Sequence, residues 1–260
     1  MTQIFADLSA MQGDMLAVCG EDYNHIKNVL RMHPGEKLAV RGTDESSEEY
    51  VFEIVSFSDS QVNCRLLSVK QSEAELAVRV ILFQGLPKAD KMDFIVQKTV
   101  EMGVTEIVPV EMHRSIVKLA GDKRRKRVSR WQSIAEAAAK QSRRAMIPRV
   151  HDILSYKEAL QYAAEAADFV LVPYEAMADE AGTGTRSLLE SMKTGQTAAV
   201  FVGPEGGFEK SEIEAALEGG ARTISLGKRI LRVETAAISI LSLIMIRLEI
   251  ASGMDFDAEE

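Results

Sequence analysis

Cysteine, histidine and tryptophan are scarce in this sequence of 260 residues, which has two cysteines, four histidines and one tryptophan. Cys19 and Cys64 lie far apart and lack the spacing of metal ligands. A disulfide framework and a structural zinc site are therefore excluded, and the pattern predicts two buried, reduced thiols. No other grouping of His, Cys, Asp and Glu has ligand spacing, so we expect no metal.

Long apolar runs are also missing. The longest, Thr235 to Ile246, is interrupted by serines and followed by Arg247 and Glu249, so it is too short to span a membrane. The first residues include Asp7 and Asp14 and show no basic segment followed by an apolar one, as a secretory signal would. We therefore expect a soluble cytoplasmic protein with no membrane partner.

The common nucleotide-binding signatures are absent as well. No G-x-G-x-x-G follows an apolar run, and the segment Gly203 to Phe208 lacks the Lys-Ser/Thr of a phosphate-binding P-loop. A dinucleotide or ATP site is therefore poorly supported.

The chain does have apolar residues for a packed core, at 46% of its composition, and its texture changes along its length. Up to about residue 72, short segments alternate apolar and polar residues between turns, which indicates a small antiparallel barrel. From Leu76 on, apolar runs alternate with helical patterns, which indicates an α/β domain with a parallel sheet. We predict two domains, 1–72 and 73–260.

Apolar periodicity places the individual elements. Buried strands are expected at 78–83, 106–110, 168–172, 198–202 and 223–226. Helices are expected at 25–32, 91–102, 132–142, 188–192 and 235–250, and after an N-cap at Ser211. Residues 183–185 are expected to form a flexible connection.

Two glycine-containing loops follow the last two expected strands. The first contains Gly203-Pro204-Glu205-Gly206-Gly207, and the second begins at Leu226-Gly227. Glycine lets the backbone approach a ligand with no side chain between them. Two such loops in succession predict a cradle for a small molecule.

A basic segment at 118–130 carries seven positive charges and one acid, in a chain whose net charge is −8. Anionic partners respond to the local potential rather than to the total charge. The segment therefore predicts binding of nucleic acid, through residues that include Lys123, Arg124, Arg125 and Arg127.

The two glycine loops resemble a known signature. Phe201-Val202-Gly203-Pro204-Glu205-Gly206-Gly207-Phe208, followed by Leu226-Gly227-x-Arg229-Ile230-Leu231-Arg232-x-Glu234-Thr235-Ala236, is similar to the RsmE family of 16S ribosomal RNA uracil-N3 methyltransferases, of the SPOUT class. The resemblance implies a PUA-like RNA-binding domain before a SPOUT domain with a carboxy-terminal trefoil knot. It also implies a homodimer that methylates N3 of uridine 1498 in 16S ribosomal RNA of the small subunit, with S-adenosylmethionine as donor.

The resemblance assigns functions to individual residues. The donor would be held by Val172, Pro173, Glu175, Val202, Gly203, Pro204, Glu205, Gly206, Leu226, Gly227, Ile230, Leu231, Arg232, Thr235 and Ala236. RNA would be bound by His25, Arg31, Lys88, Arg114 and Arg144, in addition to the four residues of the basic segment named above.

Arg232 is the expected catalytic residue, because it lies just before an apolar helix, where a cation can stabilise the uracil anion. The other interpretation of Arg232 is a structural ion pair with Glu234 or Glu205. Two alternatives for the protein are a SPOUT enzyme acting on another RNA position, such as a ribose 2′-hydroxyl, and a non-catalytic RNA-binding assembly factor. The helix from Thr235 to Ile250 is apolar on all sides, which favours a homodimer.

Overall fold

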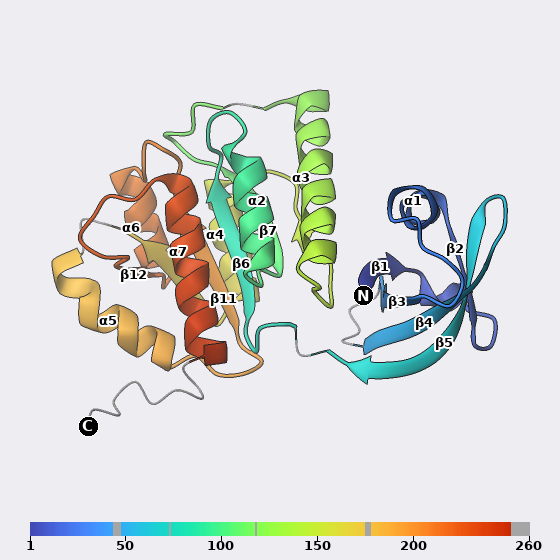
Figure 1. Ribbon diagram of the computed structural model, residues 1–260. Coiled ribbons are helices and arrows are strands. Elements are labelled where there is room, and N and C mark those ends of the chain that lie inside the picture. Colours follow the sequence, from blue (N-terminus) through green and yellow to red (C-terminus); the bar gives the residue numbers. More distant parts are fainter. Residues whose placement is uncertain (44–47, 73, 118, 175–177, 251–260) are drawn as a thin grey trace, which may run out of the picture. The chain divides into compact units, whose positions relative to one another are not determined.

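The computed structural model describes residues 1–43, 48–72, 74–117, 119–174 and 178–250, which form two compact units (Figure 1). The first unit contains the described residues up to Glu75 together with Ala139–Ile147. The second contains those from Leu76 to Ala138 and from Pro148 on. The inclusion of Ala139–Ile147 in the first unit has no counterpart in the sequence pattern. The domain limits at 72 and 73 stay a prediction.

The first unit is built on a five-stranded sheet with the order β1-β3-β4-β5-β2. Pairing is parallel between β1 and β3 and antiparallel elsewhere. Two register shifts in the pairing of β4 with β5 bend the sheet around its core. The strands are β1 (Thr2–Ala6), β2 (Met15–Cys19), β3 (Lys37–Gly42), β4 (Glu48–Phe57) and β5 (Gln61–Gln71).

The two cysteines lie in strands whose side chains alternate between the core and the solvent, and one cysteine is buried whereas the other is exposed. Cys64 of β5 lies in the core opposite Leu16, and burial raises the pKa of its thiol to about 11. Cys19 ends β2 and is exposed. Both thiols are free, as predicted, but the prediction that both are buried is wrong for Cys19.

Helical backbone in this unit differs from the predicted helix at 25–32. A 3-10 turn spans Leu8–Ala10, then α1 covers Gly20–Asn24 and a π-helical turn, η2, covers His25–Val29. Arg31 has a φ of +54°, which ends the helix before Met32. The prediction therefore located the helix but misplaced both of its ends.

The second unit is a seven-stranded sheet with the order β12-β10-β11-β6-β7-β8, in which β9 also pairs with β7. Every strand pairing in it is parallel. Its strands are β6 (Arg79–Gly85), β7 (Glu106–Glu111), β8 (Arg149–Val150), β9 (Leu154–Ser155), β10 (Phe169–Pro173), β11 (Thr197–Val202) and β12 (Arg222–Ile224). The predicted α/β class with a parallel sheet is confirmed, and the knot stays a prediction.

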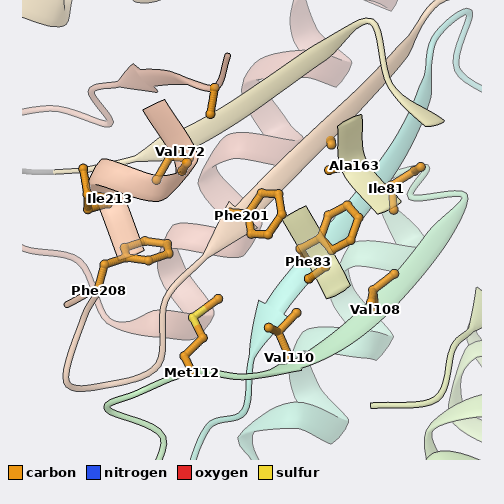
Figure 2. Packing of buried hydrophobic residues seen from close by; sticks show 14 residues of the cluster. Ile81, Phe83, Val108, Val110, Met112, Ala163, Val172, Phe201, Phe208 and Ile213 are labelled. Carbon is orange, nitrogen blue, oxygen red and sulfur yellow. The ribbon is translucent and has the colours of Figure 1, made fainter. Parts of the chain in front are cut away.

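Helices cover both faces of this sheet. Figure 1 shows α2 and α7, which pack against each other, on one face. On the other face, α4 and α6 contribute to a core with stacked rings of Phe83 and Phe201, whose centroids are 4.4 Å apart (Figure 2). The helices are α2 (Lys91–Glu101), α3 (Gly121–Gln141), α4 (Tyr156–Ala166), α5 (Ala178–Glu190), α6 (Lys210–Glu218) and α7 (Val233–Met245), which continues as the π-helical η4 (Ile246–Ile250).

Three predictions for the helices are wrong in detail. Residues 121–130 of the basic segment are helical and continuous with the predicted helix at 132–142, because Lys and Arg are good helix formers. Residues 183–185, expected to be a connection, lie within α5. The N-cap of α6 is Glu209 rather than Ser211, since Glu209 and Glu212 form a reciprocal capping box. The sequence pattern missed α4, although Ser155 and Glu158 form a capping box at its start.

A buried carboxylate, Glu106, joins the amino-terminal ends of β6 and β7. It accepts hydrogen bonds from Arg79 at 2.8 Å and Tyr162 at 2.6 Å, and its Oε2 lies 2.7 Å from Nε2 of His151. The hydrogen bond with His151, opposed by burial and helped by Tyr162 and Arg79, lowers the pKa of Glu106 to about 2. Burial and the bond to this carboxylate raise the pKa of Tyr162 to about 12.

We predict that Glu106→Gln lowers the free energy of unfolding of the second unit by about 2–3 kcal/mol at pH 7. Because the pKa is depressed from 4.5 to about 2, the carboxylate stabilises the folded state above pH 4.5 and loses this effect as the pH falls towards 2. Urea unfolding followed by the fluorescence of the single tryptophan, Trp131, measures the difference.

The loss should be smaller at pH 3 than at pH 7. Glu136→Gln, at an exposed position of α3, is the matched control and should leave stability unchanged. An equal loss for Glu106→Gln at both pH values would show that the ionisation of Glu106 does not contribute to the free energy of unfolding.

Candidate functional site

A cavity of about 400 Å³ opens at the carboxyl ends of the strands in the second unit, where ligands bind in open parallel sheets. It is formed by the last residues of β10 and β11, by the loops that follow β11 and β12, by the first turn of α7 and by the first residue of α2. The lining residues are Lys91, Pro173, Val202, Gly203, Pro204, Glu205, Gly206, Gly207, Phe208, Ile230, Leu231, Arg232, Val233 and Ala236.

The loop after β11 is compact because glycines remove side chains at close approaches. A Cβ on Gly206 would lie 2.9 Å from Cβ of Arg114, whose Nη1 donates a hydrogen bond of 3.0 Å to the Gly206 carbonyl. Gly207 has a φ of +68° and donates to the carbonyl of Pro204 at 2.9 Å. Phe208 then turns into the core, as Figure 2 shows. The loop therefore presents backbone to the cavity and is fixed from beneath.

A buried carboxylate connects this loop to the one after β7. Glu212 of α6 is only 7% exposed and accepts from the amides of His113 and Glu209, both at 2.8 Å. Its carbonyl accepts from the hydroxyl of Tyr156 at 2.8 Å. The contacts of Glu212 hold α6, and with it the Gly203–Phe208 loop, against β7 and α4.

The loop after β12 combines a glycine at a positive φ, which residues with a side chain rarely adopt, with an exposed apolar side chain. Gly227 has a φ of +104°, and its amide donates to Oγ of Ser225 at 3.1 Å. Ile230 lines the cavity although its side chain is 85% exposed. A large apolar side chain left open to water beside a cavity is suited to contact a ligand.

Arg232 is the N-cap residue of α7 and lines the same cavity. Within the described ranges it has no ion-pair partner. The two carboxylates suggested as its partners, Glu205 and Glu234, instead pair with Lys91, at 3.0 and 3.6 Å. The structural ion pair considered for Arg232 is therefore contradicted, and its guanidinium is left for other contacts.

Lys91 is the charged residue of the cavity that was not among the predicted site residues. It follows Ala89, whose φ of +54° is rare for a residue with a side chain. The amide of Lys88 donates to Glu205 at 3.0 Å in the same turn. The hydrogen bond with Glu205 raises the pKa of Lys91, while the pKa of Glu205 is lowered because the bonds from Lys88 and Lys91 outweigh its partial burial.

Most of the predicted donor-binding residues are brought together in this cavity. Val172 is buried in the core beneath it, and Leu226, Gly227 and Thr235 are close in sequence to lining residues without lining it themselves. Glu175 lies outside the described residues. Gly207, Phe208 and Val233 line the cavity without having been predicted; the first two belong to the glycine-loop pattern itself.

The residues predicted to bind RNA differ in how exposed they are. Lys88 of the second unit is exposed, as are His25 and Arg31 of the first. Arg114 is exposed but bonded to Glu209 at 2.8 Å. Arg144 is 2% exposed and its Nε donates to both carboxylate oxygens of Glu75 at 3.0 Å, so this placement does not support an RNA contact.

The basic segment lies on the first half of α3, where it borders a second cavity, of about 550 Å³. Lys123 and Arg127 line it, as do Lys126 and Arg130, which were not predicted. Arg124 and Arg125 do not line it, and Arg125 pairs with Asp122 of its own helix.

In the part of the chain that the structure describes, no three His, Cys, Asp or Glu residues are grouped as metal ligands would be. No described helix is both long and apolar enough to cross a membrane.

Comparison with known proteins gives matches along most of the chain. Residues 74–245 match the model of the RNA methyltransferase domain, and residues 18–67 match that of the RNA methyltransferase PUA domain. The chain is 34% identical over 257 residues to the ribosomal RNA small subunit methyltransferase E of Bacillus subtilis, which covers 97% of this chain and 99% of that protein.

Two solved structures have the same fold over nearly their full length. The crystal structure of a hypothetical protein aligns with a TM-score of 0.87 at 33% identity, covering 96% of this chain and 99% of that one. A ribosomal RNA small subunit methyltransferase E from Neisseria gonorrhoeae, crystallised with S-adenosyl methionine, aligns with a TM-score of 0.79 at 29% identity. That match covers 93% of this chain and 95% of the other.

We predict that Gly85→Ala disturbs the cavity from below. A Cβ there would lie 2.7 Å from N and Cδ of Pro204 and 2.8 Å from Sδ of Met112, so the loop after β11 must shift. Overpacking of this kind costs about 1–3 kcal/mol. Denaturant unfolding followed by Trp131 fluorescence measures it.

Gly184→Ala in α5 is the matched control, since a Cβ there meets nothing within 4 Å. Replacing a helical glycine should keep or raise stability, by up to about 1 kcal/mol. Equal stability of the two variants would contradict the close approach at Gly85.

Proposed function

The chain belongs to the ribosomal RNA small subunit methyltransferase E family, and we propose that it methylates N3 of a uridine in 16S ribosomal RNA. As a member it is an S-adenosylmethionine-dependent ribosomal RNA methyltransferase. The choice of uracil N3 and of uridine 1498 rests on the loop signatures at Gly203 and Leu226. The observation that carries the proposal is the glycine-lined cavity at the carboxyl edge of the parallel sheet.

The cavity fits S-adenosylmethionine in size and in chemistry. Its volume, about 400 Å³, is in the range of small-molecule sites, which run from about 300 to 1,000 Å³. Backbone groups of Gly203 to Gly206 and of Ile230 and Leu231 would hold the polar parts, and the side chain of Ile230 would cover apolar surface. Bound there, S-adenosylmethionine supplies an electrophilic methyl group.

The acceptor nitrogen must lose its proton before it can attack a methyl group. The pKa of the uracil imide lies roughly two to three units above neutral pH, so removing its proton costs about 3–4 kcal/mol. A fixed cation beside the base stabilises the anion and recovers part of this. We assign this role to Arg232, because it lines the cavity and has no ion-pair partner among the described residues.

Lys91 has a different role in this proposal. Its ion pairs with Glu205 and Glu234 join the loop after β11 to the first turn of α7. The pairing engages the two carboxylates that would otherwise compete for the Arg232 guanidinium. Lys91 is therefore a positioning residue, which keeps Arg232 available to the substrate.

The test of the function is methyl transfer to 16S ribosomal RNA transcribed in vitro, or to small ribosomal subunits from a deletion strain. Mass mapping identifies the methylated position. Calorimetry with S-adenosylmethionine separates an enzyme from a non-catalytic assembly factor, which would show no donor affinity. A methyl group found on a ribose would reject the N3 assignment and keep the methyltransferase.

Arg232→Ala should lower kcat by about 100-fold, which is typical when one donor to a developing anion is removed, while donor affinity changes little. The rate of the variant should also keep increasing up to a higher pH than the rate of the wild type does, because the uracil proton must be lost without the help of the cation. Stopped-time assays across pH measure both effects.

Arg232→Lys keeps the positive charge and should restore part of the rate. Arg222→Ala, at an exposed position of β12, is the control for removing one charge. A kcat for Arg232→Ala within a fewfold of the wild type would rule out this role.

We further propose a homodimer that uses the outer face of α2 and α7. Val233, Ala237, Ile240, Leu241 and Ile244 bury one side of α7. On the outer side, Leu243 is 38% exposed and Ile246 is 40% exposed, and Phe94 of the adjacent α2 is 45% exposed. Exposed apolar side chains on two helices that pack together are typical of a surface that is buried against another protein chain. We also propose a cytoplasmic location, because the proposed substrate is small-subunit ribosomal RNA.

Leu243→Glu should convert the dimer into monomers, because a charge in an apolar contact costs several kcal/mol. Light scattering at micromolar concentration measures the mass. Leu217→Glu is the matched control, since Leu217 is exposed to a similar degree on α6 and should tolerate the change. A monomeric wild-type enzyme that methylates RNA would exclude the dimer.

A further inference from the structure

Four of the six residues that line the second cavity of the second unit are cations. Its lining residues are Asp90, Leu119, Lys123, Lys126, Arg127 and Arg130, and its volume is about 550 Å³. The four basic residues are spaced i, i+3, i+4 and i+7 along α3, so they share one face of the helix. We call these four side chains the groove cations.

The groove cations differ in how firmly they are held. Arg130 is fixed by Asp93, with Nη2 2.7 Å from Oδ2, and the same carboxylate accepts from Nε1 of Trp131 at 3.1 Å. Arg127 makes only a loose contact of 3.7 Å with the exposed Asp90. Lys123 and Lys126 are exposed and have no ion-pair partner in the described ranges. The groove therefore combines one oriented guanidinium with three cations that are open to water.

Arg124 and Arg125 do not line the groove. Arg125 pairs with Asp122 of its own helix, and the charge of Arg124 is the smallest of the influences that lower the pKa of Glu158 in α4. The structure thus divides the basic segment into a groove face and a second face whose charges are partly neutralised. Sequence alone could not separate them, because all of these residues lie within one short run.

The groove lies next to the methyl-transfer cavity along the chain. Asp90, the N-cap residue of α2, lines the groove, and Lys91, the first residue of the helix, lines the other cavity. A polyanion held by the groove cations would therefore pass close to the site where Arg232 and the donor loops meet.

We propose that the groove cations bind phosphodiester groups of the RNA strand beside the target nucleotide and position it for methylation. The inference rests on the proposed function. Guanidinium groups match phosphate oxygens with two parallel hydrogen bonds, and lysines add compact, mobile charges. An open groove with four cations and one carboxylate suits an anion that stays partly hydrated, as an RNA backbone does.

The decisive variant is K123A/K126A, which removes the two unpaired lysines and leaves the guanidinium contacts to Asp90 and Asp93 in place. Binding of 16S ribosomal RNA is measured over a series of KCl concentrations. We expect affinity to fall roughly tenfold at low salt. The slope of log K against log salt should become shallower by about 1.4, since each contact to a single strand contributes about 0.7.

Two matched pairs test whether position or mere charge matters. K157A/K193A removes two exposed lysines elsewhere in the same unit and should leave affinity and slope unchanged. R124A/R125A removes two charges from the other face of α3 and should have a clearly smaller effect than K123A/K126A. An unchanged slope for K123A/K126A, or an equal loss for R124A/R125A, would overturn the proposal.

The same proteins separate this inference from the proposed function. With the groove impaired, KM for RNA should rise, while kcat at saturating RNA and the affinity for S-adenosylmethionine are retained. A wild type that binds RNA through the groove but methylates nothing would refute the function alone. Loss of poly-glutamate binding in K123A/K126A with RNA binding intact would instead assign the groove to an acidic protein.

Discussion

The parallel pairing of β6 with β11 is the constraint on which the rest of the second unit depends. Residues Thr197 to Val202 pair in register with Arg79 to Gln84, and this brings Phe201 opposite Phe83, where their rings stack. Because the two strands run in the same direction, the loops that follow them emerge at one edge of the sheet. The glycine loop after β11 and the turn that begins α2 are therefore neighbours, although more than a hundred residues separate them in the sequence.

This proximity creates the electrostatics of the cavity. Lys91 stands at the end of the β6 loop, and its partners Glu205 and Glu234 come from the β11 loop and from α7. One cation between two carboxylates leaves this group with a net charge of −1, and Arg232 is the unpaired cation of the described lining. The core supports the arrangement from beneath, because Phe208 holds the loop in the same cluster as Phe83 and Phe201. Packing thus fixes the charges, and the charges determine what the cavity can stabilise.

Sequence reasoning predicted the parts of the site that are local patterns. Gly203 to Gly206 and Ile230 to Arg232 are contiguous signatures, and the structure places both in one cavity. It missed Lys91, because this lysine looks like any other lysine at the start of a helix. Its role comes from ion pairs with carboxylates that are distant in the sequence. It also chose Ser211 as a cap where Glu209 and Glu212 cap reciprocally, because the general preference of serine for this position was outweighed by a specific pair. Arg144 shows the same limit: the family resemblance assigned it to RNA, whereas its burial beside Glu75 does not support that contact.

The turn at Ala89 to Lys91 joins the two cavities of the catalytic unit, and its backbone explains how. A residue with a side chain at a φ of +54° is strained, and such strain persists only where surrounding contacts over-determine it. Here the contacts are the Lys88 amide on Glu205 and the ion pair of Lys91 with Glu205. On the groove side, Arg127 makes only a loose contact of 3.7 Å with the exposed Asp90, so a phosphate can draw Arg127 away without disturbing the turn. If the groove binds RNA as proposed, the strand would therefore lie beside a turn whose position is fixed by its contacts with Glu205.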